Sequence, residues 1–406
     1  MKSNWNEVKI DDICSIRRGA SPRPIQKYIS KRGIPWVKIA DATSSNSRFI
    51  NETKEFIIEE GKEKSRYIEK GTLILSNSAT PGLPKFMNIN GCVHDGWLIL
   101  DGFKGVYDNF LYYNLIENRI KLLSLSNGSV FRNLKTDIVK NFNIKLPPLE
   151  EQKSIAKILS DLDEKIEVNN KINKNLEEMA QTIFKQWFVD FEFPNEEGKP
   201  YKSSGGEMVE SELGMIPKGW EISKLGNYIE LYDSKRIPLS KNEREKREKI
   251  YPYYGAASLM DFVDDYIFEG VYILMGEDGT VSDNLGYPIL QYVWGKFWVN
   301  NHAHVIKGVL DISEEFIYIL LKNTNVKQII TGAVQPKINQ KNLREVNIVM
   351  PVKKDIVKKY SDLVNKMFFK IRILTDENER LEKLRDTLLP KLMSGEIRVP
   401  LENSED

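Results

Sequence analysis

One stretch, residues 147–190, constrains the fold more than any other part of the chain. Pro147 and Pro148 stand at its start, where proline is tolerated, and no proline or glycine interrupts it before Pro194. The sequence therefore predicts a single helix about 60 Å long, at 1.5 Å of rise per residue. Side chains spaced alternately by three and four residues form a coiled-coil seam along it. The predicted seam residues are Leu159, Leu162, Ile166, Asn169, Asn173, Leu176 and Ile183.

The two asparagines, Asn169 and Asn173, interrupt this apolar seam at its centre. They have two interpretations: solvated residues where the seam drifts outward, or polar contacts that fix the register of a helix pair. In either case a helix of this length with one apolar stripe is not stable alone, so it needs a partner helix.

The chain contains a repeat that supplies this partner. Residues 128–148 (GSVFRNLKTDIVKNFNIKLPP) align without a gap with residues 332–352 (GAVQPKINQKNLREVNIVMPV), so that Leu134 matches Ile338 and Pro147 matches Pro351. A second long helix is predicted after the second copy, over residues 354–393. Its predicted packing residues are Leu363, Met367, Leu374, Leu381 and Leu388. Two similar units in one chain can pack with approximate two-fold symmetry, which would place the two helices antiparallel.

The pattern predicts five segments. Residues 1–147 and 219–352 each carry short apolar runs bounded by glycine and asparagine together with a helical stretch, which is typical of mixed α/β domains. Residues 148–190 are the central helix, and residues 353–406 the C-terminal helix with its tail. Residues 191–218 are rich in Gly, Ser, Pro and Glu and are predicted to be an irregular connector.

Composition excludes several classes of protein. The 406 residues carry 59 basic and 58 acidic side chains, a net charge of +1, so a polyanionic partner must be met by local basic patches. No apolar run reaches the roughly 18 residues of a membrane span. The first residues do not resemble a secretory signal, and the two cysteines, Cys14 and Cys92, are isolated. We therefore expect a cytoplasmic protein.

A search for catalytic patterns finds little. The sequence has no P-loop, no dinucleotide-binding glycine motif, no nucleophile elbow and no Asn- or Asp-Pro-Pro-aromatic motif of adenine methyltransferases. His94 lies near Cys92 and Asp95, and His302 and His304 have ligand-like spacing, but no acidic or cysteine cluster accompanies them in sequence. We expect His94 to serve packing or a turn, and His302 and His304 to be structural or to contact phosphate. We expect no metal and no cofactor.

Basic loops are the strongest functional signal. Cations next to Gly, Pro, Ser and aromatic residues suit contacts with phosphates and base edges, although the segment KNEREKREK alternates in sign and is also typical of an exposed charged face. The candidate DNA-binding residues of the first block are Arg17, Arg18, Arg23, Lys27, Lys31, Ser78, Thr80, Lys85, Arg132 and Lys135. Those of the second block are Lys235, Arg236, Lys241, Asp278, Thr280, Asn300 and His302.

The chain resembles the specificity subunit of type I restriction-modification systems over essentially its whole length. The resemblance rests on LPPLEEQKSIAKILSDLDEKIEVNNKINKNLEEMAQTIFKQWFVDFEFP, GKPYKSSGGEMVESELGMIPKGWE, HDGWLIL, NNHAHV and LRDTLLPKLMSGEIRV. It implies two mixed α/β target recognition domains, separated by two long antiparallel coiled-coil helices with a pseudo-two-fold repeat. Each domain would read one half of a split site in double-stranded DNA.

The resemblance also implies partners. The helices would be a spacer and a docking surface for two methyltransferase subunits, through which ATP-dependent restriction subunits join, and this chain would have no catalytic residues. Two alternatives stay open on the residues alone: a stand-alone DNA methyltransferase or nuclease with an unrecognised site, and a purely structural coiled-coil protein. Binding of S-adenosylmethionine would indicate the first, and failure to bind duplex DNA would indicate the second.

Overall fold

The computed structural model describes residues 5–44, 47–125, 133–309, 311–332 and 334–400. It divides into two compact units, which we call unit 1 (Met1–Asn169 with Asp376–Asp406) and unit 2 (Asn170–Thr375). The predicted mixed α/β fold with two long helices is confirmed: α7 covers Leu149–Phe184 and continues as a π-helical turn over Lys185–Val189, and α11 covers Asp355–Ser394. None of the helices in the described residues combines the length and the apolar character that crossing a membrane requires.

Unit 1 contains two five-stranded sheets and a two-stranded one. The first sheet has the order β2-β11-β8-β9-β5, the second the order β3-β6-β4-β10-β7, and β1 pairs with β12. The strands are β1 Asn6–Lys9, β2 Ser15–Arg18, β3 Ile29–Ser30, β4 Ile34–Val37, β5 Phe49–Ile50, β6 Phe56–Ile57, β7 Arg66–Ile68, β8 Leu73–Ser76, β9 Pro84–Met87, β10 Gly91–Val93, β11 Trp97–Asp101 and β12 Asn143–Leu146. The shorter helices are α1 Ile10–Ile13, α2 Ile39–Thr43, α3 Glu59–Lys62, α4 Asp108–Glu117, α5 Arg119–Ser124 and α6 Thr136–Lys140.

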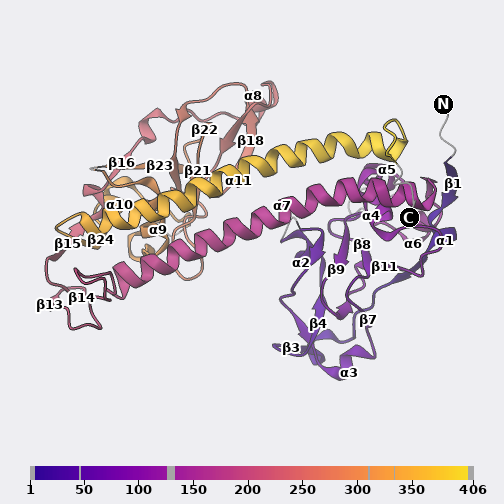
Figure 1. Ribbon diagram of the computed structural model, residues 1–406, viewed down its shortest axis with the longest axis horizontal. Coiled ribbons are helices and arrows are strands. Elements are labelled where there is room, and N and C mark those ends of the chain that lie inside the picture. The colour runs from indigo at the N-terminus through magenta and orange to yellow at the C-terminus, as the bar shows by residue number, and fades with distance from the viewer. Residues whose placement is uncertain (1–4, 45–46, 126–132, 310, 333, 401–406) are drawn as a thin grey trace. The chain divides into compact units, whose positions relative to one another are not determined.

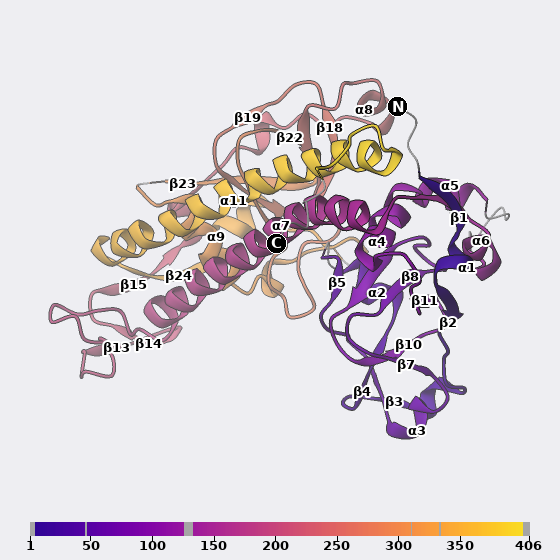
Figure 2. The same ribbon diagram turned by 45° about the vertical axis from the view of Figure 1, so that its right-hand side comes forward.

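The strands β8 and β11 of the first sheet of unit 1 are almost wholly apolar and are buried on both faces. Leu75 and Leu98 lie on the face that packs against α4 and the beginning of α7, whereas Ile74 and Ile99 lie on the face that packs against the second sheet. Figure 2 shows this layering, with β8 and β11 between α7 and the strands β4 and β10. The ends of the strands are therefore the part of the sheet that the layers leave accessible.

Unit 2 has two four-stranded sheets, ordered β16-β23-β20-β21 and β18-β17-β22-β19, together with the pairs β13-β14 and β15-β24. The strands are β13 Met208–Ser211, β14 Gly214–Pro217, β15 Trp220–Lys224, β16 Ile229–Leu231, β17 Tyr251–Tyr254, β18 Leu259–Val263, β19 Phe268–Glu269, β20 Tyr272–Gly276, β21 Leu290–Val293, β22 Lys296–Val299, β23 Ala303–Gly308 and β24 Asn347–Pro351. The shorter helices are α8 Lys241–Glu245, α9 Glu314–Lys322 and α10 Gln340–Arg344.

The two units repeat the same backbone hydrogen bonds, which extends the repeat predicted from sequence. The N–H of Leu134 donates to Asn77 O at 2.8 Å, and that of Ile338 donates to Glu277 O at 2.9 Å. The aligned segments also form matching elements, since α6 and β12 correspond to α10 and β24 at the same offset. The strand ends of unit 1 therefore have counterparts in unit 2.

The two long helices pack against each other within each unit and run antiparallel (Figure 1). In unit 1, Asn169 is fully buried and donates from Nδ2 to Asn378 Oδ1 at 2.9 Å and to Glu377 Oε2 at 2.8 Å. In unit 2, Asn173 Nδ2 donates to Thr375 Oγ1 at 3.1 Å. Both asparagines thus form polar contacts between the helices rather than facing solvent, as the register-fixing interpretation requires.

Most of the predicted seam faces inward. Leu159, Ile166 and Leu374 are buried, and Leu162, Leu176, Ile183, Met367, Leu381 and Leu388 are partly buried. Leu363 departs from the prediction, because its side chain remains 39% exposed. The reason is that α11 presents Val357, Tyr360, Val364 and Phe368 to the core of unit 2, including Phe184 and Phe316. Packing against a globular core buries a wider stripe than a coiled-coil seam does, and it turns Leu363 outward.

Candidate nucleic-acid interface

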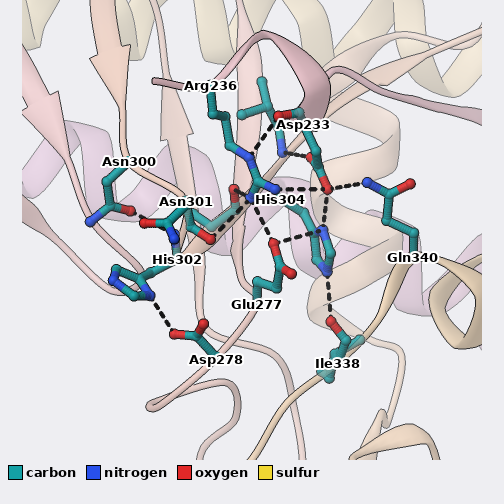
Figure 3. Close-up of polar contacts among 12 residues, drawn as sticks. Asp233, Arg236, Glu277, Asp278, Asn300, Asn301, His302, His304, Ile338 and Gln340 are labelled. Atoms are coloured by element: carbon teal, nitrogen blue, oxygen red, sulfur yellow. Dashed lines mark hydrogen bonds and ion pairs between the residues drawn. The ribbon is translucent and has the colours of Figure 1, made fainter. Parts of the chain in front are cut away.

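In unit 2, three loops meet at one end of the sheet that contains β16, β23 and β20. They are the segment after β16, the segment after β20 and the turn 300–302 between β22 and β23 (Figure 3). The N–H of Glu277 donates to His302 O at 2.9 Å, which joins the second loop to the third. The side chains at this end of the sheet are mostly polar, although the strands behind them are apolar.

A buried pair, Asp233 and His304, ties the first loop to β23. His304 Nδ1 lies 2.6 Å from Asp233 Oδ2, and His304 Nε2 lies 2.8 Å from the carbonyl oxygen of Ile338. Both ring nitrogens of His304 therefore face oxygen atoms that accept hydrogen bonds. The second oxygen of Asp233 accepts from the N–H of Val305 at 2.9 Å, and Gln340 Nε2 donates to Oδ2 at 2.7 Å.

Arg236 and Glu277 complete this network. Arg236 Nη1 donates to Glu277 Oε2 at 2.7 Å and to Ala303 O at 2.6 Å, and its Nε donates to Asp233 O at 2.9 Å. Lys337 Nζ lies 3.2 Å from the other oxygen of Glu277. We call Asp233, Arg236, Glu277 and His304 the ion-pair network. Its hydrogen bonds and ion pairs connect the three loops to one another.

The network shifts the pKa of both carboxyl groups downward. Burial alone would raise the pKa of Asp233, but hydrogen bonds from His304 and from the N–H of Val305, together with the charge of Arg236, lower it below its ordinary value. Burial likewise opposes ionisation of Glu277, and the hydrogen bond from Arg236 with the charge of His304 lowers its pKa.

Asp233, Glu277 and His304 are also residues of the kinds that bind metals, and their donor atoms lie within 4.8 Å of one another. However, Asp233 and His304 are hydrogen-bonded to each other, and Arg236 already neutralises Glu277. A metal ion would have to displace these contacts. The donor set is therefore better described as a closed ion-pair network than as a metal site.

Beside this network lies a second pair, formed by Asp278, whose side chain is 19% exposed, and the more exposed His302. His302 Nδ1 is 2.6 Å from Asp278 Oδ1, and the His302 side chain is 48% exposed. The turn that carries His302 is held by Asn300, whose Oδ1 accepts from the N–H of His302 at 2.8 Å. Two of the predicted DNA-binding residues, Asp278 and His302, thus contact each other, and a third, Asn300, is buried and supports the turn that carries His302.

Unit 1 places polar residues at the corresponding end of its sheet. The N–H of Asn77 donates to Gly96 O at 2.8 Å, as Glu277 does to His302. In the same turn, Asp95 Oδ1 accepts from Ser21 Oγ at 2.7 Å, and Asp95 Oδ2 lies 3.6 Å from Arg23 Nη2. Burial opposes ionisation of Asp95, but the hydrogen bond from Ser21 and the charges of His94, Arg18 and Arg23 lower its pKa. Burial also lowers the pKa of His94, whose Nδ1 accepts from the N–H of Gly96.

Several predicted cations are exposed. The Arg23 side chain is 79% exposed, Arg17 pairs with Asp101, and Arg18 Nε donates to Asp95 O at 2.8 Å. Lys235 lies over the ring of Tyr232, and Lys241 pairs with Glu245 at 3.7 Å. Lys27, Lys31, Lys135 and Thr280 are also exposed, whereas Ser78 and Thr80 are partly buried. Arg132 lies outside the described residues.

Three predicted DNA-binding residues lie in the interior instead. Lys85 and Asn300 are buried, and the guanidinium of Arg236 is enclosed in the ion-pair network. Lys85 Nζ donates to Ser47 O, and burial lowers its pKa. In this conformation these three side chains contact backbone or carboxylate groups of the chain itself. Sequence reasoning missed Asp233, Glu277 and Gln340 as members of the network, because only the pairing of distant strands brings them together.

Comparison with known proteins identifies the family of this chain. Residues 2–178 and 217–383 match the family described as type I restriction modification DNA specificity domain. The chain is 30% identical to the type I restriction enzyme MjaIX specificity subunit of Methanocaldococcus jannaschii, over 98% of this chain and 94% of that protein. It is 22% identical to the type I restriction enzyme HindI specificity subunit of Haemophilus influenzae, over 97% of this chain and 100% of that protein.

A solved structure shares the fold. The crystal structure of the type I restriction-modification S subunit from M. genitalium matches with a TM-score of 0.56 at 18% identity, over 96% of each chain. Both family matches fall on the repeated blocks and on the long helix that follows each of them. The chain therefore belongs to the family of type I restriction-modification DNA specificity subunits.

Proposed function

We propose that this chain is the sequence-reading subunit of a type I restriction-modification complex and that unit 1 and unit 2 each read one half of a split site in double-stranded DNA. The observation that carries the proposal is the repeat of one construction. In both units, loops from the same strands meet at the same end of a doubly covered sheet and present polar side chains there. Such side chains hydrogen-bond to base edges, and nearby exposed cations such as Arg23 contact phosphates.

The two long helices are the proposed scaffold. Each is continuous and belongs in part to both units, so the helices can set the separation of the two half-sites. Half-sites read from one face of B-DNA lie about 34–36 Å apart, or a multiple of that distance. The methyltransferase subunits would dock on these helices and would bring in the restriction subunits.

Unit 2 offers a docking feature of suitable chemistry on this helix pair. A groove there is lined by Leu176, Lys359, Asp362, Leu363, Lys366, Met367 and Lys370. Its floor combines partly exposed leucine and methionine with three lysines, which suits an amphipathic partner segment with acidic residues. We assign this groove to a methyltransferase subunit.

The proposal gives this chain no catalytic role of its own, so methyl transfer and cleavage belong to its partners. Titration of the isolated chain with S-adenosylmethionine in a calorimeter should give no binding heat. Binding at micromolar concentration would instead favour a stand-alone methyltransferase.

An exchange of blocks tests the reading function. Residues 1–147 are replaced by the corresponding block of another member of the family, and methylated adenines are mapped across a genome that expresses the complete complex. We expect one half of the recognised sequence to change and the other half to stay. A change in both halves would show that the two units do not read independently, and methylation without sequence preference would refute the reading function itself.

A further inference from the structure

The pair formed by Asp278 and His302 has more backbone contacts around it than a side-chain pair at a protein surface normally has. Exposed pairs usually contribute little to stability, because two mobile side chains must be held in one geometry. Here the backbone at Asp278 and the backbone at His302 are each held by contacts that do not involve the pair itself. Asp278 lies in a bridge with Lys337, the N–H of Gly279 donates to Pro336 O at 3.0 Å, and His302 is bonded through both its N–H and its carbonyl.

The ion-pair network adds to these contacts. Glu277 precedes Asp278 directly, and Arg236 donates to the backbone oxygens of Ala303 at 2.6 Å and Asn301 at 3.4 Å, on either side of His302. Buried charges that are fully paired hold their geometry closely, since any displacement would leave a charge without a partner. The network therefore positions the pair of Asp278 and His302 (Figure 3).

The hydrogen-bonding capacity of the pair defines what it can read. The Asp278 carboxylate only accepts hydrogen bonds, so Nδ1 of His302 is the donor between them. In the neutral ring, Nε2 is then an acceptor, and no hydrogen-bond partner for it is found within the described residues. The pair thus presents two kinds of acceptor on one rigid support, the free lone pairs of the carboxylate and Nε2.

We propose that Asp278 and His302 select one base pair in the half-site of unit 2 by accepting hydrogen bonds from an exocyclic amino group in the major groove. This inference rests on the proposed function. The amino group is N4 of cytosine or N6 of adenine, the major-groove donors of B-DNA. The carboxylate repels O6 of guanine and O4 of thymine, which present lone pairs where the amino group would stand. The pair would contact the base directly, and the ion-pair network would hold the pair in position.

The test uses the chain assembled with its methyltransferase subunit. The recognised sequence of the wild-type complex is mapped first, and binding is then measured on four duplexes that carry each base pair at one position of the unit 2 half-site. The wild type should prefer cytosine or adenine at one such position by roughly tenfold or more. Comparison of these two bases identifies which amino group is read.

Asp278→Asn should abolish this preference, because an amide also donates and so tolerates guanine and thymine. His302→Gln should reduce the preference at the same position. Because the His302 side chain is 48% exposed, this second variant should fold even if Asp278→Asn disturbs the loop. The matched control is Glu221→Gln, which removes one exposed carboxylate from β15 of the same unit. The control should keep the wild-type preference at every position.

The inference is overturned if both variants keep the wild-type base preference, or if they weaken all four duplexes by the same factor. The second result would indicate a phosphate contact or a purely structural pair. A wild-type complex without any sequence preference would refute the proposed function rather than this assignment alone. A change confined to the half-site read by unit 1 would contradict the assignment and leave the reading function intact.

Discussion

At the scale of single residues, the ion-pair network should make the stability of the protein depend on pH. Asp233 and Glu277 have pKa values below those of ordinary Asp and Glu. The unfolded chain binds protons at these two positions at about pH 4, whereas the folded chain binds them only at lower pH. Their contribution is therefore complete above the unfolded pKa values and is lost as the pH falls through the folded ones. Urea denaturation should give a constant contribution between about pH 7 and 5, and a declining one below about pH 4.

Replacing one member of the network tests the same residues at neutral pH. Asp233→Asn leaves His304 and Arg236 without their shared carboxylate, so we expect the free energy of unfolding to fall by about 3 kcal/mol. The difference from wild type should shrink at acid pH, where Asp233 is protonated in both states. Asp264→Asn is the matched control, because Asp264 is exposed and forms a surface pair with Arg247 at 2.9 Å. It should change the free energy of unfolding by less than about 0.5 kcal/mol. Equal effects of the two substitutions would show that the network does not stabilise the fold.

At the scale of elements, the groove on the helix pair of unit 2 is the feature that most directly tests the scaffold role. Leu363 lies in it with a substantial part of its side chain exposed, although its position in the seam pattern predicts burial. Leu363→Glu places a charge where an apolar partner surface is proposed, so binding of the methyltransferase subunit should weaken by roughly tenfold or more. Calorimetric titration of the chain with the purified methyltransferase subunit measures this change.

The control for that substitution is Ile120→Glu, which changes an even more exposed aliphatic residue on α5 of unit 1. Both variants add the same charge, and both positions already face solvent, so folding should be preserved in each. Ile120→Glu should bind the methyltransferase subunit as the wild type does. If Leu363→Glu also bound normally, the groove would not be the docking site.

The elements also show how far sequence alone leads. The two long helices were predictable, because a spacing of three and four residues without proline or glycine is a local signal. The correspondence of α10 with α6 was also predictable, because residues 128–148 align without a gap with residues 332–352. The burial predicted for Leu363 was wrong, because the seam pattern considers only the partner helix. In the structure α11 also packs against the globular core of unit 2. Asp233 and His304 could not be paired, because 71 positions separate them and the pairing depends on strand order.

At the scale of the whole molecule, the two units form equivalent loops from different residues. Asn77, Gly96 and Leu134 occupy in unit 1 the backbone positions that Glu277, His302 and Ile338 occupy in unit 2. The hydrogen bonds that recur are between backbone atoms, and these do not depend on the side chain. The backbone of these loops can therefore be kept while their side chains change, which is what the proposed reading of two different half-sites requires.

The near-zero net charge of the whole chain predicts how its DNA binding responds to salt. A net charge of +1 supplies little general attraction to a polyanion, so affinity depends on a few local cations and on base contacts. Each phosphate contact contributes about 0.9 to the slope of log affinity against log salt concentration and is indifferent to sequence. Raising salt from about 50 mM to about 200 mM should therefore weaken the assembled complex on matched and unmatched duplexes by a similar factor, as measured by fluorescence anisotropy.

Arg23 distinguishes phosphate contacts from base contacts within this salt dependence. Its side chain is 79% exposed, and its only ion pair within the described residues, at 3.6 Å from Asp95, is long. Arg23→Gln should reduce the slope by about 1 and weaken all duplexes equally, whereas Asp278→Asn should change base preference and leave the slope unaltered. If Arg23→Gln altered base preference at one position instead, Arg23 would contact a base rather than a phosphate, and its assignment in unit 1 would be wrong.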